Sequence, residues 1–191
     1  TDALNAGDNT LRLLLKGDVT AGGNRFVRLY DETIATTGHR PELIVDFTVT
    51  PATTFQEGVS PTGGYTHDAV YIRQGQPTSN QNTDPDQELI VGFTTGTSDE
   101  MRGLLEFEVS AMPAANTIDS VSIVLRTGGG LSSSITINLY EYDYDIVESV
   151  SDWQDPDGDG NDGTGDTTSG GTLGTALSAV TFDPTVSADI T

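Results

Sequence analysis

Three short apolar runs stand close together near the start of the chain, and they constrain the fold more than any other feature. They cover residues 11–15, 25–30 and 42–49, and turn residues such as Gly, Asp and Asn lie between them. Runs of this length with β-branched and aromatic residues, bounded by turn residues, indicate strands. Three strands are too few to bury both faces of a sheet. This opening segment, residues 1–49, therefore needs further strands to pack against.

Residues 50–64 (TPATTFQEGVSPTGG) are rich in Pro, Thr and Gly and have no apolar period. This composition predicts an extended linker. Such a linker spans about 50 Å at ~3.3 Å per residue. It is long enough for the opening segment to fold back on its own chain or to reach a neighbouring copy, and both remain open.

The remainder of the chain, residues 65–191, is expected to form the body of a β-sandwich. Strands at this spacing without helical patterns indicate an all-β sandwich or barrel. Three glycines at 128–130 predict a hairpin between the fourth and fifth of these strands. Short helix-like pieces are expected only at 2–6 and 187–191. The predicted strands cover residues 68–73, 88–93, 101–109, 118–127 and 134–142.

The charge balance excludes several classes of partner. The 191 residues carry 29 Asp and Glu against 8 Lys and Arg, a net charge of −21. Nucleic acids and anionic membranes are poor partners, because binding them requires Lys and Arg. Divalent cations, a mineral surface or a saline medium fit better, and solubility alone is the plainer explanation.

The chain has no cysteine, so disulfides and thiolate metal sites are excluded. We find no apolar run near transmembrane length and no signal-peptide pattern, and therefore expect a soluble chain without membrane insertion. A core of this size needs no disulfide bonds, so secretion after removal of a signal peptide remains compatible with the sequence.

An acidic loop after Trp153 carries the sharpest chemical motif. Carboxylates alternate with other residues and are followed by a glycine, as in the first half of an EF-hand calcium loop. Calcium binds six to eight hard oxygens, and clustered carboxylates repel each other without a cation. No flanking helices are expected, so the prediction is a calcium loop, residues 155–166, on a β scaffold; a solvated acidic loop is the alternative. The predicted ligands are Asp155, Asp157, Asp159, Asn161 through its carbonyl, and Asp166.

Two acidic pairs are weaker cation candidates. They are Asp84 with Asp86, and Asp143 with Asp145. The second pair lies in a run in which tyrosines alternate with acids. An aromatic face can stack on sugars, but packing against the core is the preferred interpretation for these tyrosines and for Trp153.

No catalytic constellation is recognisable. The two histidines, His39 and His67, both lie beside turns. No Gly-x-Ser-x-Gly motif, phosphate loop or zinc-ligand spacing is present, and we expect no enzyme activity.

The single lysine, Lys16, ends the first apolar run. It is either a solvated strand-end residue or, if buried beside a carboxylate, a partner in an isopeptide crosslink to an Asn or Asp side chain.

The order and spacing of residues between 68 and 153 resemble DNRLRE-type modules. That resemblance implies a secreted β-sandwich akin to carbohydrate-binding jelly rolls, typical of microbial surface proteins. The acidic loop after Trp153 departs from the family, which has a shorter turn there, and no sugar-contact residue is transferred. The matching segments are 68–73, 89–92, 102–107 with 112–113, 118–125, 137–140 and Trp153.

The resemblance also implies an identity for the opening segment. Family members end with a helical turn and three strands, the last reading Arg-Pro-x-Leu-x-Val. Residues 11–15, 25–30 and 40–45 resemble those three strands, displaced from the tail of the module to the head of the chain. Residues 186–191 and 1–7 would together form the helical turn.

Three arrangements follow: a circularly permuted module, one unit of a tandem repeat, or donor-strand complementation in which the segment completes the next subunit. The last two produce fibres. The sequence therefore predicts an extracellular or cell-surface filament subunit that assembles head-to-tail with copies of itself and binds calcium. The alternative is a carbohydrate-binding or adhesion module that binds polysaccharide or a mineral surface.

Overall fold

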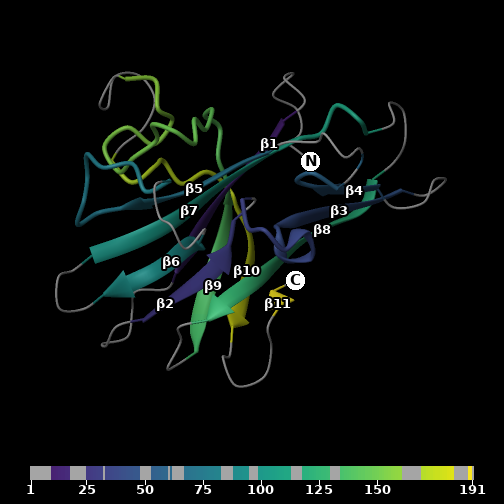
Figure 1. Ribbon diagram of the computed structural model, residues 1–191, viewed down its shortest axis with the longest axis horizontal. Coiled ribbons are helices and arrows are strands. Elements are labelled where there is room, and N and C mark those ends of the chain that lie inside the picture. Colours follow the sequence, from purple (N-terminus) through teal and green to yellow (C-terminus); the bar gives the residue numbers. More distant parts are fainter. Residues whose placement is uncertain are drawn as a thin grey trace.

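The computed structural model describes residues 10–17, 25–31, 33–47, 53–59, 61, 67–82, 88–94, 99–112, 118–129, 134–160, 169–182 and 189–190. Within these ranges the regular structure is almost entirely strand, with a single 3-10 turn, η1 (Figure 1). The elements are β1 (Thr10–Gly17), β2 (Arg25–Tyr30), η1 (Thr37–His39), β3 (Glu42–Phe47), β4 (Thr53–Gln56), β5 (His67–Arg73), β6 (Glu88–Thr94), β7 (Asp99–Glu108), β8 (Ile118–Gly129), β9 (Ile135–Glu141), β10 (Ala176–Phe182) and β11 (Asp189–Ile190).

Antiparallel pairing arranges the strands in two sheets. The first sheet has the order β10-β9-β1-β7-β5, and the second has the order β6-β2-β8-β3-β4, with β11 also paired to β8. The two sheets are continuous where the first residues of β7 pair with the end of β6, with Met101 opposite Gly92. They pack as a sandwich-like fold, which confirms the all-β prediction.

The strands of the opening segment lie inside these sheets and not at their edges. β1 pairs with β7 on one side and β9 on the other. β2 lies between β6 and β8, and β3 lies between β8 and β4. In this single chain, all three therefore pair with strands of the same chain.

Most expected strands are confirmed, with boundaries that shift by one or two residues. Within the expected linker, residues 53–56 form β4, which pairs with β3. The edge strand β10 was not expected. The predicted hairpin of 118–127 with 134–142 is wrong, because β8 pairs with strands of the second sheet and β9 with strands of the first. The helical turn expected at 187–191 is also wrong where the chain is described, since 189–190 form β11; residues 2–6 lie outside the described ranges.

The main core lies between the two sheets and draws on both. Alternate residues of each strand point inward, so each sheet contributes one face of apolar side chains. Within the described ranges, no helix is long and apolar enough to cross a membrane. The buried residues of this core are Leu11, Leu13, Leu15, Val27, Leu29, Leu43, Val45, Phe55, Ala69, Tyr71, Leu89, Val91, Met101, Leu105, Phe107, Val109, Leu125, Ile135 and Ile137.

The first sheet is covered on its outer face as well. A second cluster joins β1, β5 and β7 to residues 142–153, which form loops (green in Figure 1) above β5 and β7. Burial on both faces explains why Leu13, Leu14 and Leu15 are consecutive apolar residues instead of alternating with polar ones. The second cluster contains Leu14, Val70, Ile72, Leu104, Tyr142, Ile146 and Trp153.

Two glycines allow the sheets to part at the β6–β7 corner. A Cβ atom on Gly17, the last residue of β1, would lie 2.8 Å from the Cα atom of Gly92 in β6. Gly92 itself has φ of +146°, a conformation that side chains disfavour. The corner where the end of β1 approaches the end of β6 therefore requires residues without side chains.

Candidate metal centre

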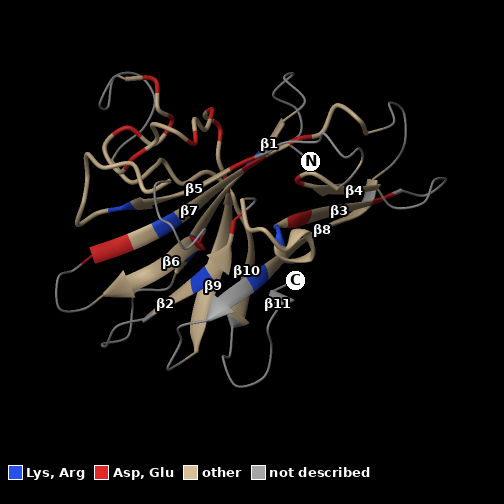
Figure 2. Cartoon of the chain, in the orientation of Figure 1, with Lys and Arg blue, Asp and Glu red and all other residues tan. Residues whose placement is uncertain are grey.

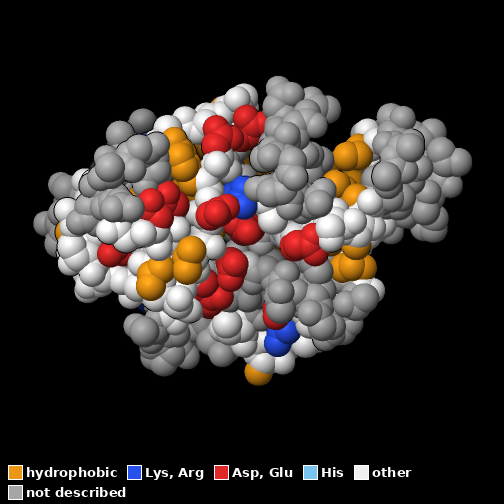
Figure 3. Space-filling view, turned by 90° about the horizontal axis from the view of Figure 1, so that it is seen from above, with side chains coloured by type: hydrophobic (Ala, Val, Ile, Leu, Met, Phe, Trp, Pro, Cys, Tyr) orange, Lys and Arg blue, Asp and Glu red, His pale blue; other side chains and the backbone are white. Residues whose placement is uncertain are grey.

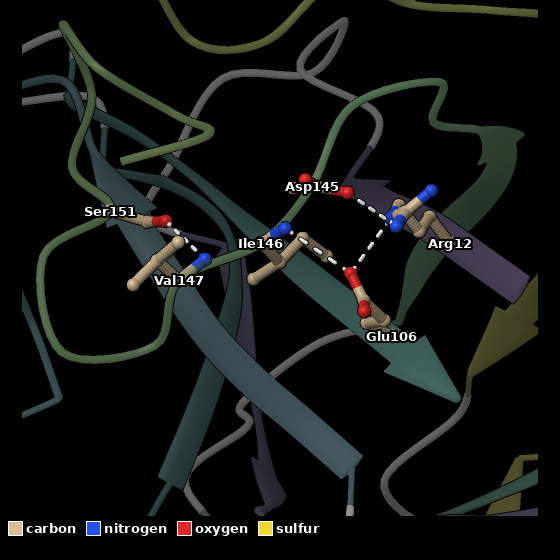
Figure 4. Close-up of polar contacts among 6 residues, drawn as sticks. All are labelled: Arg12, Glu106, Asp145, Ile146, Val147 and Ser151. Atoms are coloured by element: carbon tan, nitrogen blue, oxygen red, sulfur yellow. Dashed lines mark hydrogen bonds and ion pairs between the residues drawn. The ribbon is translucent and has the colours of Figure 1, made fainter. Parts of the chain in front are cut away.

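The candidate metal loop leaves from a segment that is tied to the outer face of the first sheet. An ion pair fixes the start of this segment: Arg12 Nε in β1 lies 2.7 Å from Glu106 Oε2 in β7, its register partner. Arg12 also pairs with Asp145 of the covering segment. The backbone N–H of Ile146 donates to the same Glu106 oxygen at 3.2 Å (Figure 4). Residues 145 and 146 are thus held down on β1 and β7.

A second attachment lies nearer the loop. The backbone N–H of Val147 donates to Ser151 Oγ at 3.1 Å (Figure 4), and Ser151 is fully buried. Asn80, which follows β5, donates through Nδ2 to the carbonyls of Glu148 and Ser151, both at 2.8 Å. These bonds close residues 147–151 into a compact turn beneath the acidic loop.

Asp152 shapes the entry to the acidic loop. Its Oδ1 accepts hydrogen bonds from the backbone N–H groups of Gln154 at 2.8 Å and Asp155 at 3.0 Å. The Gln154 N–H also lies 2.9 Å from the Pro77 carbonyl, so it shares its hydrogen bond between this carbonyl and Asp152. Side-chain bonds of this local type fix a turn without regular secondary structure.

Asp155 organises the first half of the loop. Its Oδ1 accepts from the N–H of Asp159 at 3.2 Å, and its Oδ2 accepts from the N–H of Gly160 at 2.9 Å. The backbone therefore curls around this carboxylate. Gly158 and Gly160 take φ of +69° and +86°, which only glycine adopts at little cost. The sharp turn expected from the glycine at position six of a calcium loop is present at Gly160.

Three carboxylates converge inside this curl. Asp155, Asp157 and Asp159 each offer an oxygen, and these oxygens lie within 4.8 Å of one another. Asp155 and Asp157 are buried, and Asp159 is exposed. Two oxygens bound to one calcium ion lie at most about 5 Å apart, because each Ca–O distance is about 2.3–2.6 Å. The spacing of the three aspartates therefore fits a shared cation of this size.

Asn161 and Asp166 lie outside the described residues, as do Asp84 and Asp86. Asp145 pairs with Arg12 and is committed to the covering segment. Asp143, its expected partner, is exposed. The structure thus brings together three of the five predicted calcium ligands.

The chain returns from the loop to the same base from which it left. Gly170 and Gly171 have φ of +87° and +81°, and the N–H of Gly170 donates to the Trp153 carbonyl at 2.6 Å. Arg102 of β7 donates through Nη1 to the carbonyls of Gly170 at 2.6 Å and Gly171 at 3.2 Å. Its guanidinium carbon lies 5.0 Å from the Trp153 ring centre, within cation–π range. Arg102 therefore clamps both ends of the acidic loop.

An acidic row runs beside this base. Asp68 of β5 and Glu106 of β7 are register partners. Burial raises the pKa of Asp68 above its ordinary value of 3.8, and the nearby Glu148 carboxylate, which hydrogen-bonds to it, raises it further. Burial also raises the pKa of Glu106 from 4.5, although Arg12 opposes the rise. These two carboxyl groups therefore hold a proton more readily than they would in water.

The charge distribution agrees with a cation-binding face. Asp and Glu line the loops above β5 and β7 (Figure 2), and Figure 3, which looks down on this side, shows several acidic groups and few basic ones. Such a surface attracts divalent cations and repels polyanions.

Tyr140, Tyr142, Tyr144 and Trp153 all pack in the second cluster. Tyr142 and Trp153 are buried, and Tyr144 packs edge-on against Tyr142 with ring centres 5.6 Å apart. The packing interpretation of these residues is confirmed. His39 stacks on Tyr30 at 5.1 Å, and the side chain of His67 lies outside the described set.

Three side chains that support the acidic loop were not predicted from the sequence: Asp152, Asn80 and Arg102. Asp152 stands three residues before Asp155, and Asp in this position before a turn is a recognisable capping signal. Arg102 has no such signal, because its partners at 153, 170 and 171 are brought to it only by the fold.

Comparisons with protein-family models, with curated proteins and with solved structures find no match for this chain. What the structure shares with the expected DNRLRE-type module is the all-β architecture with two antiparallel sheets.

Proposed function

We propose that this chain is a structural subunit of an extracellular filament, in which strands β1–β4 of one copy complete the jelly-roll-like sandwich of the next and calcium stiffens the body. The term β1–β4 block is used here for residues 10–56. No catalytic role is proposed.

The observation that carries this proposal is the position of the β1–β4 block in the strand ladder. Without it, the remaining strands separate into three groups with no pairing between them: β5-β7-β6, β9-β10 and β8-β11. Nine buried apolar side chains of the core also come from the block. They are Leu11, Leu13, Leu14, Leu15, Val27, Leu29, Leu43, Val45 and Phe55.

The rest of the sandwich can accept the β1–β4 block either from its own chain or from a neighbouring copy. The two arrangements contain the same pairs and the same core contacts, so they differ mainly in hinge strain and association entropy. Exchange from one copy to the next is head-to-tail and does not close on itself, so it propagates.

The hinge for this exchange is the segment between β4 and β5, residues 57–66. It contains Pro61 and three glycines, and it joins two strands in different sheets. Stretched at ~3.3 Å per residue, it spans about 30 Å. This reach is about the diameter of a small domain. The block can therefore lie on an adjacent copy without loss of its own pairing between β3 and β4.

Calcium is proposed at the acidic loop because Asp155, Asp157 and Asp159 converge there around a turn built by Gly160. Hard carboxylate oxygens are the ligands that calcium prefers. The loop is tied through Arg102 and Trp153 to β7, so a bound ion would stiffen the cover of the first sheet. The resemblance of residues 68–153 to secreted modules supports the extracellular setting, where millimolar calcium suits sites of modest affinity.

Assembly is tested by sedimentation of the full chain over a wide concentration range with calcium or with a chelator, and by electron microscopy of the same samples. The proposal predicts linear particles whose length grows with concentration, with shorter or fewer particles after chelation. A species that remains monomeric at all concentrations, with or without calcium, would contradict it.

A further inference from the structure

The single lysine of the chain lies at a junction of three strands. Lys16 is near the end of β1, on the outer face of the first sheet with Arg12 and Leu14. Its register partners are Arg102 on β7 and Asn138 on β9. Its side chain is 23% exposed, so most of the stem is withdrawn from water.

Asn138 faces Lys16 directly across the strand pair. Side chains of register partners in antiparallel strands share a face, with Cβ atoms about 5 Å apart. The Asn138 Nδ2 lies 3.5 Å from the Lys16 carbonyl oxygen, so its amide group is turned toward β1. The four-carbon stem of lysine is flexible enough to bring Nζ back onto that amide.

A carboxylate completes the group. Glu100 Oε1 lies 3.5 Å from Lys16 Nζ, and its side chain is 14% exposed. The same oxygen accepts a hydrogen bond from Arg102 Nε at 2.9 Å, which fixes its position beside the lysine. Lys16 thus has a carboxylate on its β7 side and a carboxamide on its β9 side, all on the same face of the first sheet.

We propose that Lys16 and Asn138 form an isopeptide bond, with Glu100 as the proton carrier. The Glu100 carboxylate takes a proton from the Lys16 ammonium group, and the neutral Nζ attacks Cγ of Asn138. The bond from Cγ to Nδ2 then breaks. Nδ2 takes the proton held by Glu100 and the second proton that Nζ loses as the amide forms, and it leaves as an ammonium ion. Atoms and charge balance without an oxidant, a reductant or a cofactor.

Proximity is what drives such a reaction. Holding an amine against an amide within a folded protein raises its effective concentration by many orders of magnitude. A carboxylate within reach of the nucleophile supplies general acid–base catalysis. The bond would tie β1, from the β1–β4 block, to β9 in the body across 122 residues.

The inference is independent of filament assembly. The bond forms between whichever chains supply β1 and β9: within one chain in a closed monomer, and between successive chains in an exchanged filament. In the filament, the bond would link successive subunits covalently.

The test begins with the intact mass of the full chain after incubation at neutral pH and denaturation. The proposal predicts a mass below the sequence value by one ammonia molecule per chain. Trypsin should then fail to cut after Lys16 and yield a branched peptide of residues 13–25 joined to residues 127–191. An unmodified mass with separate peptides ending at Lys16 would overturn the proposal.

Three variants identify the roles. Lys16→Arg keeps the positive charge beside Glu100 but cannot form the amide, and Asn138→Ala removes the acceptor; both should retain the full sequence mass. Glu100→Gln should fold with the bond slowed at least tenfold or lost. Thr136→Ala, on the same face of β9, is the matched control and should crosslink as the parent does. Normal crosslinking in Glu100→Gln would refute the role of Glu100.

The outcomes separate this inference from the filament proposal. A monomer lacking one ammonia supports the bond and opposes strand exchange, whereas a ladder of multimers that resists denaturant supports both. Filaments of unmodified chains support assembly and overturn the bond. Lys16→Arg should also melt about 10 °C or more below the crosslinked parent, because the bond restrains a long loop in the unfolded chain.

Discussion

Replacing Arg102 with methionine tests whether one side chain holds both ends of the acidic loop. Methionine keeps much of the apolar stem but removes the two hydrogen bonds to the carbonyls of Gly170 and Gly171, the cation–π contact with Trp153 and the ion pair with Glu100. Each hydrogen bond from a charged donor contributes about 1.5–3 kcal/mol, and the cation–π contact adds about 1 kcal/mol. With partial relaxation, we expect Arg102→Met to lower the free energy of unfolding by about 3–5 kcal/mol.

The assay combines urea unfolding with a calcium titration by calorimetry. A loss of this size lowers Tm by about 10 °C in a chain of this length. Because the ends of the loop would no longer be held together, we also expect calcium affinity to fall about tenfold, or about 1.4 kcal/mol.

Arg126→Met is the matched control. Arg126 also donates to a glycine carbonyl, that of Gly38 at 2.6 Å, but this bond is exposed. Exposed contacts of this kind contribute at most about 1 kcal/mol. Equal destabilisation by the two substitutions, or unchanged calcium affinity in Arg102→Met, would refute the clamp.

Two further predictions concern the metal loop and the acidic row. Asp157→Asn should weaken calcium binding about tenfold. It should also reduce the stabilisation of the fold by calcium, which is about 2.7 kcal/mol at a hundredfold excess over Kd. The control Asp143→Asn changes an exposed residue and should have neither effect, so equal calorimetric titrations of the two variants would contradict the site. The raised pKa of Asp68 means that the folded chain holds this proton more tightly than the unfolded chain does. The resulting stability is complete below about pH 4 and is lost as pH rises through the raised pKa, so Asp68→Asn should melt higher than the parent at about pH 7 and equally at about pH 3. If the difference in Tm between Asp68→Asn and the parent is the same at both pH values, then the charge of Asp68, which faces Glu148 and Glu106, does not cause the difference.

The sequence predicted the strands well because their local signals are strong. β1, β2 and β3 were all expected within about two residues of their ends, since apolar runs and turn residues mark them. The pairing of the strands was harder. The short glycine turn after β8 favours a hairpin on local grounds, yet the chain crosses there to the other sheet, because β1 occupies the position beside β9.

The edge strand β10 was missed for a related reason. Its residues are mostly exposed and small, so it carries no alternating apolar pattern. Pairing with β9 along one side creates it, and that partner is distant in the sequence. Tertiary context decides such strands more than propensity does.

In the candidate metal site, too, local features were predictable and long-range contacts were not. The spacing of Asp155, Asp157 and Asp159 before Gly160 predicted a curled loop, because these side chains and this glycine act on their own neighbouring backbone. Arg102 and Asn80 act on segments far along the chain, so only the folded arrangement reveals them. The local turn of the acidic loop could therefore be predicted from the sequence, whereas the distant residues that hold it in place could not.

The most direct test of strand exchange uses a pair of cysteines in a chain that has none. Val27 in the β1–β4 block and Val91 in β6 are buried register partners, at a spacing that suits a disulfide. Val70 and Leu104 are also register partners, but both belong to the body, so their cysteine pair is the control.

The measurement is non-denaturing oxidation of each double variant at high protein concentration, followed by electrophoresis in denaturant without reductant. The account predicts a ladder of disulfide-linked multimers for Val27→Cys/Val91→Cys and a single monomer band for Val70→Cys/Leu104→Cys. A fully oxidised monomer from both variants would show that the β1–β4 block completes its own sandwich and would contradict assembly by strand exchange.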